Sequence, residues 1–197
     1  MAINNVSTFL GRLGQGIKPN MFLVDVKFAD TLDKTSEQEF INVMCKSAAL
    51  PGSNLGVIEV PFRGRTVKIA GDRTFDTWTA TFFNDKDFKL RSFFEQWANS
   101  INTHDDNTAP LFKPTKSDGY MGQLFVKQLE KDATQGGAVL RQYTLMHCFP
   151  TNVSPIDLAY DSNDQVSEFT VEFQLSYWTS ETGGAAASNP PSISVDD

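Results

Sequence analysis

Alternating apolar and polar residues divide much of the chain into β-strands. Residues 21–28 are the first such run, in which Phe22, Val24, Val26 and Phe28 alternate with Leu23, Asp25 and Lys27. Because successive side chains of a strand point to opposite faces, this period of two predicts a strand with one buried face. We expect it to pair with a second strand at 39–46, and we predict further strands at 75–83, 122–131 and 138–149.

The last strand has the most regular alternation. One face of residues 169–177 carries Phe169, Val171, Phe173, Leu175 and Tyr177. The other carries Thr170, Glu172, Gln174 and Ser176. The pattern predicts one continuous strand with a core face and a wet face.

Residues 57–61 and 65–70 are predicted to form a projecting hairpin whose tip is Phe62-Arg63-Gly64. Gly64 suits the positive φ of a tight turn. A two-stranded hairpin is only marginally stable by itself, so we expect Phe62, Arg63 and Gly64 to contact a neighbouring copy of the chain.

One amphipathic helix is predicted after the strand at 75–83. Asn84 is the expected N-cap, and Asp85 and Asp87 would favour the positive end of the helix dipole. Apolar residues then recur with helical spacing and predict one buried stripe. The stripe consists of Leu90, Phe93, Phe94, Trp97 and Ile101.

The two ends of the chain differ from its middle. Residues 1–18 place Phe9 and Leu10 on a short apolar stripe interrupted by glycines, which is typical of an arm that orders on contact or of a frayed terminus. From residue 180 onward the chain is low in complexity, which predicts a flexible tail. Residues 19–179 are expected to form the single folded domain, an α+β, mainly β, antiparallel sandwich or small barrel with one principal helix.

Composition and charge narrow the function classes. The formal net charge is −7 and no segment gathers Lys and Arg, which argues against a surface that grips phosphates. A neutral or acidic wall would still let DNA slide past without binding it. The sequence has neither a basic start followed by an apolar run nor an apolar stretch of ~18 residues. We therefore expect cytoplasmic assembly and no membrane anchor.

Residues suited to catalysis are few. His147 precedes Cys148 in a predicted strand, where neighbouring side chains point to opposite faces. Cys45 and Cys148 are expected to be buried, reduced thiols, with a disulfide as the alternative in an oxidising compartment. We find no nucleotide, zinc-protease or hydrolase motif, and we predict no enzyme activity and no cofactor.

Two groups of acidic residues are candidate sites. Asp72, Arg73 and Asp76 crowd a predicted turn, where an Arg between two Asp is typical of an ion pair or of a contact to a neighbouring subunit. A second group lacks the Gly and the terminal Glu of a calcium loop, so we predict no metal there. It consists of Asp157, Asp161 and Asp164.

Two blocks of sequence support a family resemblance. The first runs from Gly71-Asp72-Arg73 through the strand at 75–83 to Asn84-Asp85, and the second comprises 149–156 and the end of the last strand at Tyr177-Trp178. With Pro19-Asn20-Met21-Phe22 they cover residues 19–178. On these residues the chain resembles the tail tube proteins of contractile-tailed bacteriophages, a family related to the tube proteins of type VI secretion and extracellular injection systems.

The resemblance implies an assembly and a set of partners. It implies a ring of six copies whose sheets join into one inner β-barrel, with rings stacked into a conduit for DNA inside a phage tail. The implied partners are further copies, the sheath, the baseplate or tube initiator, the tail terminator, a tape measure protein in the lumen, and DNA that passes without specific binding. The candidate contact residues are Phe62, Arg63, Gly64, Asp72, Arg73, Asp76, Phe9 and Leu10.

Two other interpretations stay open at this point. Within the same class, the chain could be the tube protein of a type VI secretion or extracellular injection system. From a different class, it could be a monomeric β-rich binding module or hydrolase of 21.9 kDa.

Overall fold

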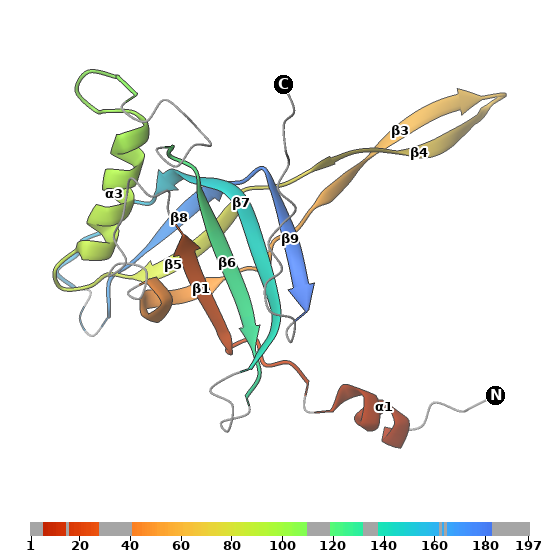
Figure 1. Cartoon of the computed structure of the whole chain (residues 1–197), viewed down its shortest axis with the longest axis horizontal. Helices are drawn as coiled ribbons and strands as arrows, with labels where there is room; N and C mark the ends of the chain where they lie inside the picture. Colours follow the sequence, from red (N-terminus) through yellow and green to blue (C-terminus); the bar gives the residue numbers. More distant parts are fainter. Residues whose placement is uncertain are drawn as a thin grey trace.

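The computed structural model describes residues 6–14, 16–27, 41–109, 119–131, 138–161, 163 and 165–182. Figure 1 shows a β-rich body from which helix α1 and the long hairpin of β3 and β4 project. The elements are α1 (Val6–Leu13), β1 (Phe22–Lys27), β2 (Cys45–Ala48), β3 (Asn54–Phe62), β4 (Arg65–Thr74), β5 (Trp78–Phe83), α3 (Lys89–Ile101), β6 (Gly122–Leu129), β7 (Val139–Val153), β8 (Glu168–Gln174) and β9 (Tyr177–Thr182).

Within the described residues, seven strands form one antiparallel sheet that the long strand β7 divides into two layers. The order is β1-β6-β7-β8-β5-β2, with β9 also paired to β7. The first part of β7 pairs with β6 and β9, whereas its last residues pair with β8. The inner layer, as we call it, is therefore β1-β6-β7-β9, and the outer layer is β7-β8-β5-β2. A mainly β, antiparallel fold with one principal helix is confirmed.

A β-bulge separates the two parts of β7. Gly122 pairs with Cys148 and Leu124 with Leu145, so two residues of β7 lie opposite one residue of β6. His147, one of these two, has a φ of 55°. Bulges bend a strand and increase its twist, which lets one strand belong to two layers.

The strands at 21–28, 122–131 and 138–149 are confirmed, and the last two pair with each other. The expected pairing of 21–28 with 39–46 is wrong. β1 pairs with β6, residues 41–44 are helical, and Cys45–Ala48 pairs with β5. The pairing of strands depends on how segments far apart in the sequence pack together, and the alternation within one strand carries no information about this.

The prediction of one continuous strand over residues 169–177 is also wrong. Residues 168–174 form β8, the chain changes direction at Leu175 and Ser176, and β9 begins at Tyr177. Leu175 is buried, but Tyr177 has turned outward and is 37% exposed. β9 then continues to Thr182, three residues beyond the expected domain end at 179, and residues 183–197 of the predicted tail lie outside the described part.

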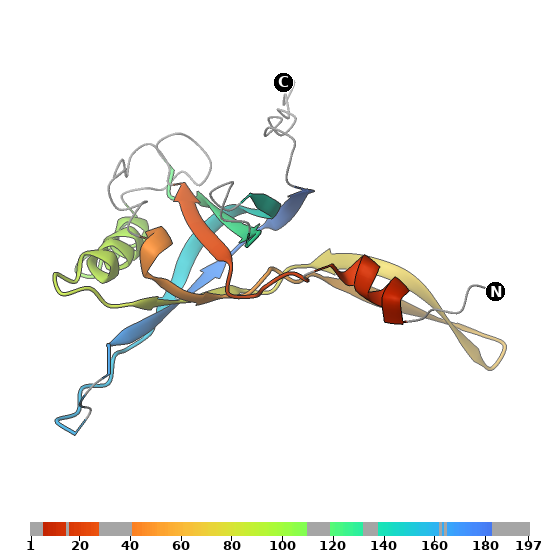
Figure 2. The ribbon, with the colours of Figure 1, turned by 90° about the horizontal axis from the view of Figure 1, so that it is seen from below.

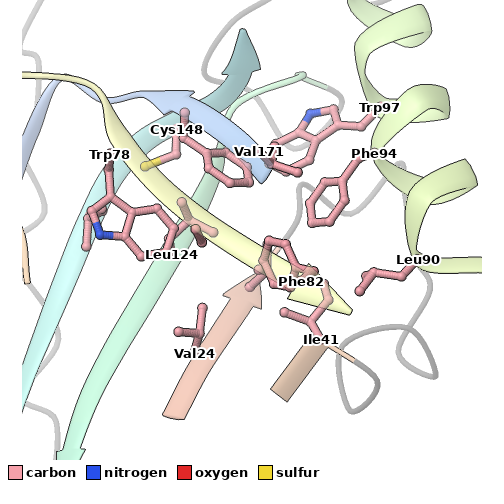
Figure 3. Close-up of a cluster of buried hydrophobic side chains, with 14 of the residues drawn as sticks. Val24, Ile41, Trp78, Phe82, Leu90, Phe94, Trp97, Leu124, Cys148 and Val171 are labelled. Carbon is pink, nitrogen blue, oxygen red and sulfur yellow. The ribbon is translucent and has the colours of Figure 1, made fainter. Parts of the chain in front are cut away.

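The core lies between the two layers and α3. Figure 3 shows Phe94 and Trp97 of α3 facing Phe82 and Val171 of the outer layer, with Val24 and Leu124 of the inner layer beneath. The Phe94 ring lies 5.3 Å from Phe82. Leu90, Phe93, Phe94 and Trp97 are buried, and Ile101 is partly buried at the margin of the cluster.

The start of α3 differs from the expectation. The helix begins at Lys89, and the backbone N–H groups of Lys89 and Leu90 donate to the two carboxylate oxygens of Asp85, at 3.1 and 3.3 Å. Asn84 is not the cap; its own N–H donates to the Ser167 carbonyl, 2.8 Å away. Asp85 reaches the helix because Phe88 adopts a left-handed conformation with a φ of 54°, which adds a tight turn before the helix.

All three tryptophans of the chain bind loops to the body through their indole N–H groups. Trp78 donates to the Ala49 carbonyl at 2.6 Å. Trp97 donates to Tyr120 at 2.8 Å, and Trp178 donates to Gly52 at 2.9 Å. A buried indole needs a hydrogen-bond acceptor, so each ring also fixes the backbone of the loop that supplies it.

Candidate functional site: surfaces for assembly

The hairpin of β3 and β4 ends in a two-residue turn. Phe62 pairs with Arg65, and both intervening residues have positive φ, 45° at Arg63 and 80° at Gly64. Two consecutive positive φ values are typical of the type I′ turn, whose twist matches that of the strands. The Arg63 guanidinium lies 5.4 Å from the Phe62 ring. The predicted hairpin and its tip are thus present, and Figure 1 shows the tip far from the body.

One face of this hairpin is largely apolar, with Arg65 beside Phe62 at the tip as its charged residue. In the register Ile58 opposes Ile69 and Val60 opposes Val67, so their side chains share a face with Phe62. We call these five residues the hairpin face. Their exposed fractions are 54%, 52%, 40%, 49% and 61% for Ile58, Ile69, Val60, Val67 and Phe62. A contiguous exposed apolar surface on a projecting element is a candidate interaction surface.

The opposite face of the hairpin is the more polar one, although Val57, Pro61 and Ala70 also lie on it. Glu59 opposes Lys68, and their charged groups lie 3.4 Å apart. Thr66 lies on the same side. A single copy of the chain therefore holds an amphipathic two-stranded ribbon away from its own core.

The base of the hairpin contains a bulge where the sequence predicted a turn. Gly71, Asp72 and Arg73 lie within β4, and two residues of β4 stand opposite Gly56 alone. A Cβ at Gly56 would lie 3.1 Å from the Asp72 carbonyl oxygen, so the backbones approach too closely for a larger residue.

The predicted ion pair of this segment is not formed in the described chain. Arg73 has no ion pair with Asp72 or Asp76 among the described residues, and Asp76 instead accepts a hydrogen bond of 2.7 Å from the Asn54 side-chain amide. Asp72, Arg73 and Asp76 are all exposed, and a role in contacts to another copy stays a prediction.

Helix α1 carries a second exposed apolar stripe. Val6, Phe9, Leu10 and Leu13 are 73%, 61%, 55% and 51% exposed. Gly14 and Gly16 follow with φ of 56° and 64°, a left-handed conformation that ends the helix. Figures 1 and 2 show α1 standing apart from the body.

The strands at the two borders of the inner layer, β1 and β9, each have one edge that pairs with no other described strand. β1 pairs only with β6, and β9 pairs only with β7, among the described strands. Antiparallel pairing places alternate residues of this layer on the face away from the core, including Asp25, Lys127 and Thr144. Lys127 and Asp25 form an ion pair there. This outward face also carries Leu23, Lys27, Gln123, Phe125, Gln142, Met146, Tyr177, Thr179 and Glu181.

A cleft of 1020 Å³ lies between the end of β5 and the segment that joins β7 to β8. We call it the 155–168 cleft. Leu158, Tyr160 and Val166 at its rim are 91%, 108% and 67% exposed. Lys46 and Glu168 pair at its edge, and the Lys46 ammonium lies 5.8 Å from the Phe83 ring. The segment projects from the body at the end opposite the hairpin (Figure 2).

The described part of the chain contains few side chains suited to catalysis. No three His, Cys, Asp or Glu side chains there lie close enough together to hold a metal ion. Both cysteines are free, and burial raises the pKa of each thiol to about 12, so neither is an activated nucleophile. The His147 ring packs against Tyr177, with 5.8 Å between centroids. No described helix is long and apolar enough to cross a bilayer.

The structure distributes the candidate contact residues over three separate places. Phe62, Arg63 and Gly64 form the hairpin tip, Asp72 to Asp76 lie at its base, and Phe9 and Leu10 lie on α1. The hairpin face was not predicted from the sequence, although the alternation on both sides of the tip contains it. The 155–168 cleft was not predicted either, because scattered apolar residues in a turn-rich segment have no period to detect.

Comparison with known proteins gives matches over nearly the whole described body. Residues 17–181 match the family described as phage tail tube protein. The tail tube protein gp19 of Enterobacteria phage T4 is 33% identical over 165 residues, which are 84% of this chain and 92% of that protein. The tail tube protein of Serratia phage KSP90 is 23% identical and covers 86% and 93%.

Solved structures share the fold. A chain of the sheath-tube complex of an extracellular contractile injection system superposes with a TM-score of 0.59 at 14% identity, covering 91% of this chain and 99% of that one. A chain of the anti-feeding prophage cap gives 0.60 at 17% identity, covering 84% and 91%.

Proposed function

This chain belongs to the phage tail tube protein family, and from that premise we propose that six copies close into a ring and that rings stack into the inner tube of a contractile tail. The subunit is a structural component of the virion tail. In this proposal the tube is a rigid conduit that a contracting sheath drives forward and through which DNA leaves the particle.

The two free edges of the inner layer support ring closure. β1 and β9 lie at opposite borders of one four-stranded antiparallel layer. Exposed strand edges pair readily with other strands, and closing a sheet into a barrel removes them. We infer that β1 of one copy pairs with β9 of the next, so that each copy adds four strands to one continuous barrel.

The outward face of the inner layer would then line the bore. Its charged residues are Asp25, Lys27, Lys127 and Glu181, so the two positive and two negative charges cancel. A neutral wall has little attraction for a polyanion, which suits a channel that DNA must pass through without sticking. The polar residues of β8, such as Thr170 and Glu172, belong to the outer layer and would lie away from the bore.

The hairpin face supports stacking. Its five apolar side chains have no core of their own, and the hairpin projects far enough to reach another copy. A contact between two different patches on identical copies repeats without limit and builds a filament. We infer that the hairpin packs on the adjacent ring, with Arg63 and Gly64 at its leading end.

Further partners follow from the same proposal. Sheath, baseplate or tube initiator, and terminator would contact the outside and the two ends of the tube, and a tape measure protein would occupy the bore before DNA does. The sequence relatives named above are phage proteins, and the injection-system structures share only the fold, which favours the phage tail over the other contractile systems.

Electron microscopy of the purified full chain tests the assembly. We expect rings with sixfold end views and stacked tubes, and a sedimentation mass several times the 21.9 kDa of one copy. A stable monomer at high concentration would contradict the proposal and favour a separate binding module.

Proline scanning of β9 tests the edge pairing. Alternate N–H groups of an edge strand point to its partner and to the free side. Thr179→Pro and Ser180→Pro each remove one backbone N–H group. In one of the two variants, the lost N–H group is one that points away from β7, toward the free edge. That variant should keep the monomer fold by circular dichroism yet lose rings, and intact rings in both variants would contradict pairing through β9.

A matched pair tests the hairpin. Ile69→Glu charges the hairpin face, whereas Thr66→Glu places the same charge on the polar face of the same strand. We expect Ile69→Glu to abolish stacking and Thr66→Glu to keep it, as counted from tube lengths in micrographs. Normal tubes from Arg63→Glu would show that the tip charge is dispensable.

A further inference from the structure

A second pair of complementary surfaces remains after the edges and the hairpin are assigned. One is the apolar stripe of α1, defined as Val6, Phe9, Leu10 and Leu13. The other is the 155–168 cleft. Both are strongly exposed in a single copy.

The α1 stripe has the spacing of a helix that binds in a groove. Its residues stand at i, i+3, i+4 and i+7, the positions that anchor an amphipathic helix in an apolar groove. At eight residues α1 is too short to be stable without packing partners. Docking in an apolar groove of another copy would supply such partners.

The cleft has the matching properties. Phe83 and Ile156 line it, and Leu158, Tyr160 and Val166 stand at its rim. Its volume of 1020 Å³ is at the upper end of the range for sites that enclose a ligand of several apolar groups.

Charge is complementary as well. Residues 155–168 contain four acidic residues and no Lys or Arg, whereas the first 24 residues of the chain contain no Asp or Glu and include Lys18. Such complementarity favours encounter of the two segments and fixes their orientation.

The two surfaces cannot meet within one copy. In both Figure 1 and Figure 2, α1 and the segment from residue 155 to 168 lie on opposite sides of the body. A contact between them joins different copies and is heterologous, so it extends a filament. Building on the proposed assembly, we propose that α1 of one copy docks in the 155–168 cleft of a neighbouring copy.

Disulfide trapping tests this docking in assembled full-length protein. The double variant Leu10→Cys with Val166→Cys should form a ladder of covalent multimers after mild oxidation, because every copy donates a helix and receives one. The matched control, Leu10→Cys with Asn99→Cys on the exposed side of α3, should form none. The native Cys148 is buried and Cys45 is partly buried, and the single-cysteine variants measure the background from both.

Mixing the single variants sharpens the result. Tubes grown from equal amounts of Leu10→Cys and Val166→Cys chains should give covalent dimers and no longer species, since each chain carries only half of one contact. A ladder from Leu10→Cys with Phe62→Cys, and none with Val166→Cys, would place α1 on the hairpin and overturn the proposal.

Charge substitution on α1 gives an independent measurement. Leu10→Glu should raise the protein concentration needed for tube growth about tenfold or more, because a buried Leu is lost, whereas Thr8→Glu on the other side of the helix should leave it unchanged. Equal behaviour of the two variants would overturn the docking. Normal rings without the Leu10–Val166 ladder would contradict only this contact, whereas the absence of rings would contradict the proposed function itself.

Discussion

At the scale of single residues, Gly122 lies at a point of close packing. A Cβ at this position would lie 3.0 Å from the Lys27 carbonyl oxygen and 3.3 Å from two ring atoms of Trp97. The glycine thus allows β1, β6 and α3 to meet at one point. Only packing reveals this requirement, because the sequence shows merely a Gly before a strand.

We expect Gly122→Ala to lower the free energy of unfolding by ~1–3 kcal/mol, since the added methyl group overpacks backbone and an aromatic ring. Urea unfolding followed by tryptophan fluorescence measures this. Gly52→Ala is the matched control, with nothing within 4 Å of its Cβ and an expected change within ~0.5 kcal/mol. Equal losses in both variants would rule out the close contact as the cause.

Cys148 makes stability depend on pH in the alkaline range. Burial raises the pKa of its thiol from 9.0 to about 12. Below pH 9 the thiol is protonated in both states, so the full stability is present; between pH 9 and 12 only the unfolded chain releases the proton, and stability falls.

Relative to Cys148→Ala, the native chain should therefore lose about 2 kcal/mol more unfolding free energy between pH 8.5 and 10.5. Denaturant unfolding of both proteins at the two pH values checks the difference. Comparing the two chains cancels the titration of Lys and Tyr. Parallel losses would show that the folded thiol ionises as readily as the unfolded one.

At the scale of elements, the sequence predicts what is local and fails where a distant segment decides. The helical stripe and the first strand follow directly from their periods. The cap of α3 does not, because the left-handed Phe88 moves the helix start to Lys89 and makes Asp85 the cap. The break between β8 and β9 is equally hidden, since β9 turns away to pair with β7.

Asp85→Ala should cost ~1 kcal/mol of stability, because two backbone N–H groups at the start of α3 lose their acceptor. Thermal unfolding by circular dichroism measures the loss. Asp87→Ala removes only an exposed pair with Lys89, at 3.3 Å, and should change stability within ~0.5 kcal/mol. A larger loss for Asp87 than for Asp85 would contradict the assigned cap.

At the scale of the whole molecule, pairing and exposure define surfaces that the sequence could only suggest. Alternation shows that each strand has two faces but does not say which face meets a neighbour. The register assigns Thr144 and Gln142 to the outward face of the inner layer, and in the proposed ring this face lines the bore.

Positive charge in the bore should make the tube retain DNA. We expect tubes of Gln142→Lys with Thr144→Lys to bind double-stranded DNA at low salt and to release it as salt rises, because bound phosphates release counterions. Asn152→Lys with Ser176→Lys adds the same charge away from the inner layer's outward face. Gel mobility with nuclease protection distinguishes enclosed from surface-bound DNA, and protection in the second variant alone would reverse the assignment of the bore.

The bulged strand β7 also has a mechanical consequence. Its 15 residues run without interruption from the inner layer into the outer layer. Circumferential stress in the barrel would therefore pass from the inner layer to the outer layer through covalent backbone. Because of this link, the two layers could not separate by sliding of side chains alone. A tube built this way should be rigid and should deform only when the hydrogen bonds between neighbouring strands break.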